Sequence, residues 1–402
     1  MHICFVCREY VPSLRGGGIA SYIKEMAHAL SEKGHKVTVI CASDDTRKES
    51  TYLDGKVNVI RLKGGDFLIP EKESPSILKK FRTFYRFYSY RKRILGTILR
   101  LKDVDIIEVP EYGAEGYYLN KLSIPVITRL HTPMLLDHFH FSIQKLNKSN
   151  WYYYWQGLQE FKQMKQAKYV TSCSSSLKEW SSKYLQIPEN KIQVIYNPIQ
   201  ITNWNQQTNH SIQHKPIKTI LFAGTICDWK GCGDLAEACR ILQSNIQTPF
   251  ELHLIGKAGT YAEELQKKYG QYSWFKLIGK IPRENLMKKY AEADVICFPS
   301  WWENMPMVCI EAMLCGGIVI GSNSGGMSEI ISNKENGFLI SPHQSKNLAE
   351  TIQKILNLSA QQRQEISQKA QQRIREDFSM DTIIQQTISY YQQVINNSTA
   401  KR

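Results

Sequence analysis

The chain has 402 residues, of which 42% are apolar and 11% aromatic, which is the composition of a globular protein long enough for two domains. No apolar run approaches the ~18 residues of a membrane span, and no basic segment followed by an apolar run opens the chain, so we expect a cytoplasmic rather than a secreted or integral protein. The formal charge of +14 is concentrated in residues 1–197, with 30 Lys and Arg against 19 Asp and Glu, which leaves nucleic acid, anionic lipid or an acidic substrate open as partners.

Short apolar runs alternate with amphipathic stretches along both halves of the chain, and a polar segment with Pro198 and Pro216 separates the halves. Apolar strands separated by helices are typical of a parallel sheet covered on both faces. We therefore predict an α/β protein with two doubly wound, Rossmann-like domains, residues 1–197 and 198–376, and a C-terminal helix within 377–402 that crosses back to the first domain. The runs lie at residues 2–7, 35–42, 104–110, 124–131 and 168–174, then 218–224, 250–256, 274–279, 293–300 and 317–323.

Three glycines, Gly16, Gly17 and Gly18, follow the first predicted strand and precede an amphipathic helix. A glycine-rich turn before a helix exposes backbone N–H groups and lets an anion approach closely, so this turn is a candidate diphosphate contact. The segment is neither the GxGxxG dinucleotide fingerprint nor a Walker loop, and a plain flexible connection is the alternative.

A strongly basic stretch, residues 78–102, carries nine Lys and Arg and no acid, with Phe81, Tyr85 and other aromatic residues at helical spacing. Such a helix suits an anionic membrane surface. A helix that packs in the domain core, with a solvated basic face, is the other interpretation.

Residues at the ends of the next predicted strands are candidates for the site. His131 ends the run 124–131, and ligands of open α/β sheets bind at the carboxyl ends of strands. Glu111 and Tyr112, after the run 104–110, are acceptor-side candidates. Asp103 and Asp105 form the DxD pattern of metal-dependent transferases, but they open an apolar strand, so we expect no metal site.

Two glutamates in the second half, Glu303 and Glu311, flank the start of a helix in the segment ENMPMVCIEAM. A carboxylate accepts bonds from two hydroxyl donors, so Glu311 suits a ribose diol and Glu303 a hexose. The backbone N–H groups of Asn304, Met305 and Met307 lie near the helix N-terminus, where phosphate oxygens bind. The alternative is a helix cap and a solvated acid.

This acid pair, with the following GGIVIGSNSGGMSEI, resembles the donor signature of retaining glycosyltransferase family 4, and the resemblance extends to the glycine turn and the loop GTICDWKG. It implies the GT-B fold, Lys230 against the donor diphosphate, and His131 contacting the transferred sugar. Thr225 stands where many members have arginine, which departs from the full phosphate clamp. The resemblance also implies front-face retention, with catalytic roles for His131 and Glu303.

The implied activity is transfer of a hexose or N-acetylhexosamine from a UDP- or GDP-linked donor to a glycan or lipid-linked acceptor, without metal or other cofactor. Base selection would fall to residues around 278–282. A sugar-nucleotide 2-epimerase, a non-catalytic protein that binds membrane or nucleic acid, and an inactive regulator are the alternatives. We expect the protein on the cytoplasmic side, in contact with the membrane if residues 78–102 bind it, and we expect no nucleic acid partner.

Overall fold

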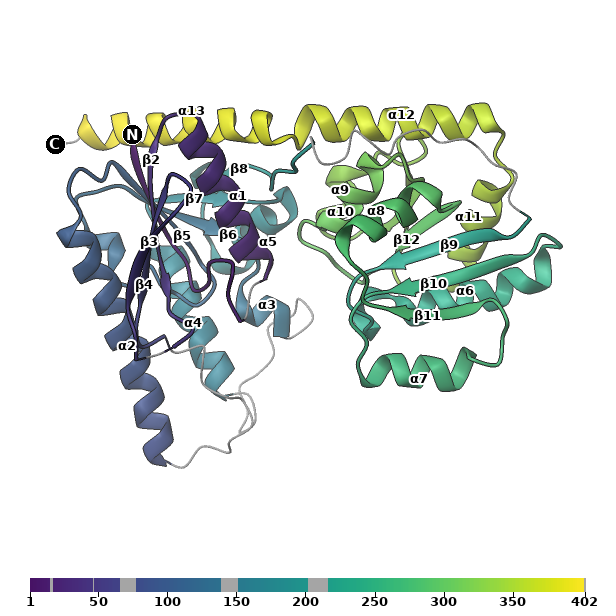
Figure 1. The fold of residues 1–402 in the computed structure, drawn as a ribbon, viewed down its shortest axis with the longest axis horizontal. Coiled ribbons are helices and arrows are strands. Elements are labelled where there is room, and N and C mark those ends of the chain that lie inside the picture. The colour runs from purple at the N-terminus through teal and green to yellow at the C-terminus, as the bar shows by residue number, and fades with distance from the viewer. Residues whose placement is uncertain (15–16, 46, 66–76, 139–150, 202–215, 401–402) are drawn as a thin grey trace. The chain divides into compact units, whose positions relative to one another are not determined.

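The computed structural model describes residues 1–14, 17–45, 47–65, 77–138, 151–201 and 216–400. The chain forms two compact units, residues 1–195 with 384–402, and residues 196–383 (Figure 1). It therefore passes from the second unit back into the first within its last helix, α13 (Met380–Thr399). The sequence placed these two changes at residues 197 and 377.

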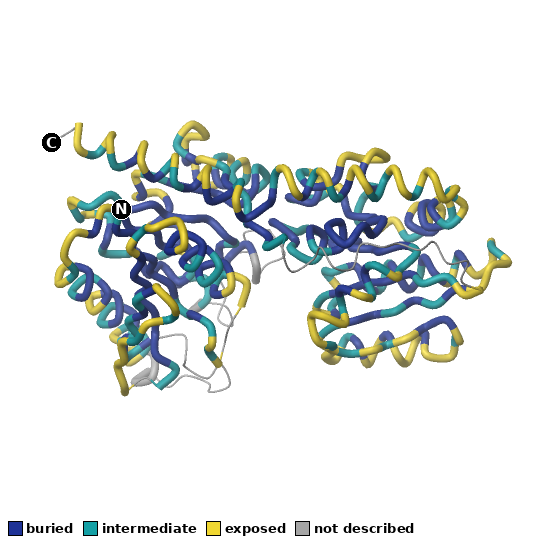
Figure 2. Tube along the Cα trace, turned by 45° about the horizontal axis from the view of Figure 1, so that its top comes forward, coloured by how far each residue is buried: buried dark blue, intermediate teal, exposed yellow. Residues whose placement is uncertain are grey.

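The first unit is built on an eight-stranded sheet in the order β3-β4-β2-β1-β5-β6-β7-β8. The neighbouring strands run parallel except for β3, which pairs antiparallel with β4. Several strands are buried along their whole length, as expected for a sheet covered by helices (Figure 2). The strands are β1 (His2–Val6), β2 (Lys36–Ala42), β3 (Ser50–Asp54), β4 (Val57–Leu62), β5 (Ile106–Pro110), β6 (Val126–Leu130), β7 (Tyr169–Ser172) and β8 (Ile192–Val194).

Helices cover this sheet and include the C-terminal part of α13, which belongs to the same unit. The helix α1 (Gly18–Glu32) begins directly after the glycine turn and buries an apolar face that includes Ile23, Met26 and Leu30. The others are α2 (Ile77–Arg100), α3 (Met134–His138), α4 (Trp151–Gln166) and α5 (Ser175–Leu185), with short 3-10 turns at η1 (Leu119–Lys121) and η2 (Glu189–Lys191).

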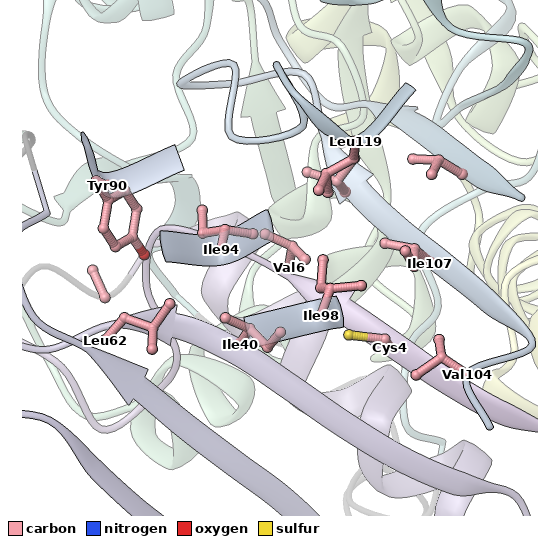
Figure 3. Close-up of a cluster of buried hydrophobic side chains, with 13 residues drawn as sticks. Cys4, Val6, Ile40, Leu62, Tyr90, Ile94, Ile98, Val104, Ile107 and Leu119 are labelled. Carbon is pink, nitrogen blue, oxygen red and sulfur yellow. The ribbon is translucent and has the colours of Figure 1, made fainter. Parts of the chain in front are cut away.

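The basic stretch forms the helix α2, and its second half packs in the core. Tyr90, Ile94 and Ile98 are fully buried beside apolar residues of β1, β2 and β5 (Figure 3). Near the start of the described side chains, Phe81 and Tyr85 are instead 69% and 73% exposed. The packing interpretation is therefore confirmed for residues 87–98, whereas the exposed aromatic residues lie outside that core.

The second unit has a six-stranded, entirely parallel sheet in the order β11-β10-β9-β12-β13-β14. The chain order reverses at β9, and such a switch point opens a crevice at the carboxyl ends of the strands. The strands are β9 (Lys218–Ala223), β10 (Phe250–Ile255), β11 (Phe275–Gly279), β12 (Val295–Phe298), β13 (Val319–Ser322) and β14 (Phe338–Ile340). The helical segments are η3 (Asp228–Lys230), α6 (Cys232–Asn245), α7 (Thr260–Tyr269), α8 (Arg283–Glu292), α9 (Met307–Leu314), α10 (Met327–Ile330), α11 (Ser345–Leu356) and α12 (Ala360–Asp377).

Both sheets are thus of the parallel α/β type that the sequence predicts, and a helix ends the chain. Among the described helices, none is both long enough and apolar enough to cross a membrane.

Candidate functional site

The carboxyl edge of the first sheet brings together the loops after β5 and β6, which are neighbouring strands. His131 follows β6 directly, and its backbone N–H donates to both carboxylate oxygens of Glu111, at 2.8 and 2.9 Å. Glu111 is fully buried. Its geometry therefore suits holding the His131 backbone in place rather than presenting a carboxylate to an acceptor.

A second buried glutamate, Glu160 of α4, joins the same two loops. One of its oxygens accepts from the N–H of Gly113 at 2.7 Å, and the other accepts from the N–H of Met134 at 2.6 Å. Burial raises the pKa of Glu160 to about 8, although both backbone donors act in the opposite direction. Burial likewise raises the pKa of Glu111 to about 7.

The conformation of the loop after β5 depends on Gly113 and on the buried Arg91. Gly113 has a φ of +82°, a conformation that favours glycine, and an added Cβ would lie 2.7 Å from the Arg8 side chain. Arg91, counted in the basic stretch of the sequence, is fully buried and donates to the carbonyls of Gly113 and Ala114. Tyr112 is half-buried beneath the guanidinium of Arg8.

The His131 imidazole is only 8% exposed and packs edge-on against the ring of Tyr22, with the centroids 5.1 Å apart. Burial and the neighbouring Arg129 cation lower the pKa of His131 well below its usual value. The imidazole is therefore neutral at pH 7. Its backbone carbonyl accepts from the hydroxyl of Thr132, so this oxygen too is held in a defined direction.

The glycine turn lies between β1 and α1, and β1 is the neighbour of β5 in the sheet. Gly16 lies outside the described residues. Gly17 and Gly18 have no heavy atom within 4 Å of an added Cβ. Packing therefore does not require glycine at these two positions, and the space beside the start of this 15-residue helix is open.

In the second unit, the loops after β9 and β12 are fastened to each other. The N–H of Trp301 donates to the carbonyl of Trp229 at 2.8 Å. Gly231, with a φ of +70°, brings the first loop so close that an added Cβ would lie 2.1 Å from the Pro299 carbonyl oxygen. The backbone thereby presents Lys230 and Glu303 to each other.

Lys230 and Glu303 form a direct ion pair through Nζ and Oε1. The hydroxyl of Ser300 also donates to Oε1 at 3.0 Å, and the lysine ammonium lies 4.1 Å from the Trp229 ring centroid. The side chains of the pair are 17% and 13% exposed, so both can be reached by solvent. The pair thus offers an ammonium that could bind a phosphate oxygen and a carboxylate that could accept from a hydroxyl.

Glu311, on the fifth residue of α9, pairs with Arg283, whose Nη2 lies 2.7 Å from Oε1. Arg283 is the first residue of α8 and directly follows the predicted base-selecting residues 278–282. Its side chain is 57% exposed, whereas that of Glu311 is 12% exposed. A ligand diol that reaches Glu311 therefore meets a carboxylate that is already paired with a long, exposed arginine side chain.

The other predicted donor residues lie in the same two loops. Asn304 and Met305 are buried in the loop before α9, and Met307 is the first residue of that helix. Thr225 is exposed in the loop after β9, where the family pattern has arginine. The fold therefore groups the predicted donor residues of the second unit around the carboxyl edge of β9 and β12, whereas the glycine turn belongs to the first unit.

The DxD pair lies at the opposite end of the strands from His131. Asp105 precedes β5, and its Oδ2 accepts from the backbone N–H of His2 at 2.7 Å. Asp103 takes a left-handed φ of 58° just before it. This arrangement gives Asp105 a structural role in joining β1 to β5.

Sequence reasoning missed several charged residues that hold the surroundings of the predicted ones. Glu108 and Arg129 are buried charges inside apolar strands, and that pattern in a strand is a detectable signal. Glu160 and Arg283 gave no such signal, because their partners are distant in the sequence.

Residues 16–203 match the model described as Glycosyltransferase Family 4, and residues 204–373 match that of Glycosyl transferases group 1. An uncharacterized glycosyltransferase of Methanocaldococcus jannaschii is 26% identical, with 97% of this chain and 98% of that protein covered. AmsK of Erwinia amylovora, an amylovoran biosynthesis glycosyltransferase, is 28% identical over 43% of this chain and 44% of its own.

A solved structure with the same fold is that of Anabaena HepE in complex with UDP. Its TM-score is 0.70 at 19% identity, with 98% of this chain and 100% of that chain covered. The likeness places the two parallel α/β units within the GT-B fold. The two family models together span most of the sequence, and the chain belongs to glycosyltransferase family 4.

Proposed function

We propose that this glycosyltransferase is a retaining enzyme that moves a hexose or N-acetylhexosamine from a nucleoside-diphosphate sugar to a glycan or lipid-linked acceptor in cell-surface polysaccharide synthesis. The observation that carries the proposal is the pairing of Lys230 with Glu303, near Glu311, at the carboxyl edge of β9 and β12. The similarity to AmsK supports polysaccharide synthesis as the setting.

The donor would be held by charged side chains that are largely buried but still reached by solvent. Glu311 accepts the two ribose hydroxyls once Arg283 has moved aside, Lys230 binds the diphosphate, and Glu303 accepts a hexose hydroxyl. Backbone N–H groups of Asn304, Met305 and Met307 at the start of α9 add donors for phosphate oxygens. Thr225 supplies one hydroxyl, and Gly17 and Gly18 are the described candidates for a phosphate contact in the first unit.

The chemistry then depends on positioning and electrostatics. The acceptor hydroxyl attacks the anomeric carbon from the face that the diphosphate leaves, and the departing phosphate oxygen takes the hydroxyl proton. Lys230 stabilises the charge that develops on the leaving group, so the reaction is expected to proceed without a metal. A neutral His131 contacts the transferred sugar through its imidazole, which packs against the buried Tyr22, or through its carbonyl, which accepts from the hydroxyl of Thr132.

Membrane attachment is a separate part of the proposal. Phe81 and Tyr85 are largely exposed beside the exposed cation Arg82, and aromatic residues next to cations favour an anionic lipid surface. Replacing both aromatic residues by serine should reduce binding to vesicles rich in phosphatidylglycerol while leaving the melting temperature unchanged. Unchanged vesicle binding would remove this element of the proposal.

The donor is tested by thermal stability against UDP-, GDP- and ADP-sugars in the presence of EDTA, beginning with UDP-glucose, which HepE binds. A ligand at a hundred times its Kd adds about 2.7 kcal/mol of stability. The sugar nucleotide that stabilises the protein is then incubated with glycan and lipid-linked acceptors, and NMR of the product reports the anomeric configuration. Inversion would overturn the retaining mechanism, and donor hydrolysis or epimerisation without acceptor would indicate a 2-epimerase.

A further inference from the structure

The C-terminal helix α13 contacts Glu108, a buried carboxylate in β5. The hydroxyl of Tyr391, in α13, donates to Oε2 of Glu108 at 2.7 Å. The other oxygen of Glu108 accepts from the hydroxyl of Tyr22 at 3.2 Å. Glu108 is 2% exposed and Tyr391 is fully buried, so the hydroxyl groups replace the water that a carboxylate otherwise binds.

A buried cation accompanies this carboxylate. Arg129, on the neighbouring strand β6, is 1% exposed and lies 4.3 Å from the centroid of the Tyr22 ring. Its Nη2 donates to the Ile195 carbonyl at 3.0 Å. Burial raises the pKa of Glu108, and Arg129 opposes that rise, so the two charges stabilise each other. A buried pair of this kind depends on all its partners, since removing one leaves a charge without compensation.

Glu108 reaches His131 through Tyr22, and Arg129 affects its charge. Tyr22, which Glu108 holds by its hydroxyl, contacts the imidazole edge-on. Arg129, in β6, lies two residues before His131, and burial together with the Arg129 cation lowers the pKa of the imidazole. The contacts therefore run from Tyr391 through Glu108 to Tyr22 and from Tyr22 to His131, and the Arg129 guanidinium lies over the same Tyr22 ring.

We propose that Tyr391 and Glu108 are positioning residues for His131, so that docking of the C-terminal helix on the first unit completes the site. The catalytic part of this inference rests on the proposed role of His131. The structural part does not, because it concerns only the environment of the imidazole.

A matched pair of variants separates this coupling from a general loosening of the helix. Tyr391→Phe removes the hydroxyl that reaches Glu108 and keeps the aromatic ring in its buried position. Tyr169→Phe removes a different hydroxyl bond between α13 and the sheet, the 3.0 Å contact with Ser398, which lies outside the Glu108 group. Each variant therefore loses one hydrogen bond to the same helix.

The first readout is the Cε1–H NMR signal of His131 in full-length protein, assigned by its loss in His131→Gln. We expect this signal to shift in Tyr391→Phe and to stay in place in Tyr169→Phe. Glu108→Gln, which keeps the shape and removes the charge, should also shift it. An unmoved signal in Tyr391→Phe, or equal shifts in both tyrosine variants, would overturn the proposal whatever reaction the enzyme catalyses.

The second readout is turnover. Tyr391→Phe should lower kcat about tenfold with the KM for donor unchanged, because misplacement of a reacting group by ~1 Å costs up to about 100-fold. Tyr169→Phe should keep the wild-type kcat. If the NMR shift occurs but kcat does not change, the coupling stands and the role of His131 in the reaction is wrong. If kcat falls equally in both variants, the helix acts only as a support.

Discussion

The two sheet edges use charge in different ways. In the first unit, Glu111 and Glu160 are fully buried and accept bonds from backbone N–H groups of the loops that carry His131. In the second unit, Lys230, Glu303 and Glu311 are partly exposed and pair with side chains. Buried carboxylates fix a backbone, whereas exposed pairs can be exchanged for a ligand. Under the proposed function, this difference would give positioning to the first unit and donor binding to the second.

The largest effect should come from Glu311→Ala. Charge-assisted hydrogen bonds are worth about 1.5–3 kcal/mol each, so the loss of both ribose bonds should lower kcat/KM for the donor about 100-fold or more. Glu237→Ala on α6 is the control, because it also removes a carboxylate paired with an arginine, Arg240, at 2.7 Å. Steady-state kinetics with varied donor measures both. Equal losses in the two variants would contradict the donor assignment.

Lys230→Met should have the next largest effect. Affinity for the intact donor should fall about 10- to 100-fold, because one charge-assisted bond to the diphosphate is removed. Affinity for the nucleoside without phosphates should change little. Calorimetric titration with both ligands makes this distinction. A parallel loss for the nucleoside would mean that the variant disturbs the fold of the loop rather than the phosphate contact.

Glu160→Gln tests the buried carboxylates through pH. The folded-state pKa of about 8 lies above the ordinary value of 4.5, so the folded protein holds this proton more tightly. The resulting stability is present at low pH and is lost as the pH rises through 8. Glutamine does not titrate, so the free energy of unfolding of wild type relative to the variant should fall between pH 4.5 and pH 8 and level off above it. Chemical denaturation across that range measures it, and a constant difference would argue against burial of this group.

The smallest effect should come from Arg283→Ala. This cation is 57% exposed, and exposed ion pairs contribute only about 0–1 kcal/mol. Removing it should raise donor affinity by at most about fivefold, because the ribose no longer displaces it from Glu311. A titration of donor into the variant at low and high salt checks the sign. A clear loss of affinity would instead make Arg283 a donor contact.

The sequence was sufficient to predict the two parallel sheets and the position of His131 at a strand end, because apolar runs and strand ends are local features. The sequence did not predict the ion pair between Glu311 and Arg283, because an arginine at a helix start looks like any solvated cation. Glu160 was missed for a related reason: its two partners, Gly113 and Met134, are distant in sequence and meet it only in the fold. Arg91 shows the reverse error, because a residue counted as surface charge is buried.

The most direct test of the division between the two edges is calorimetric titration of the identified donor into Glu311→Gln and Glu160→Gln, with turnover measured on the same samples. We expect Glu311→Gln to lose donor binding and turnover together. Glu160→Gln should bind donor as tightly as the wild type and yet turn over more slowly, because its loops no longer hold His131 in place. Tight donor binding by Glu311→Gln, or loss of binding in Glu160→Gln, would contradict the account.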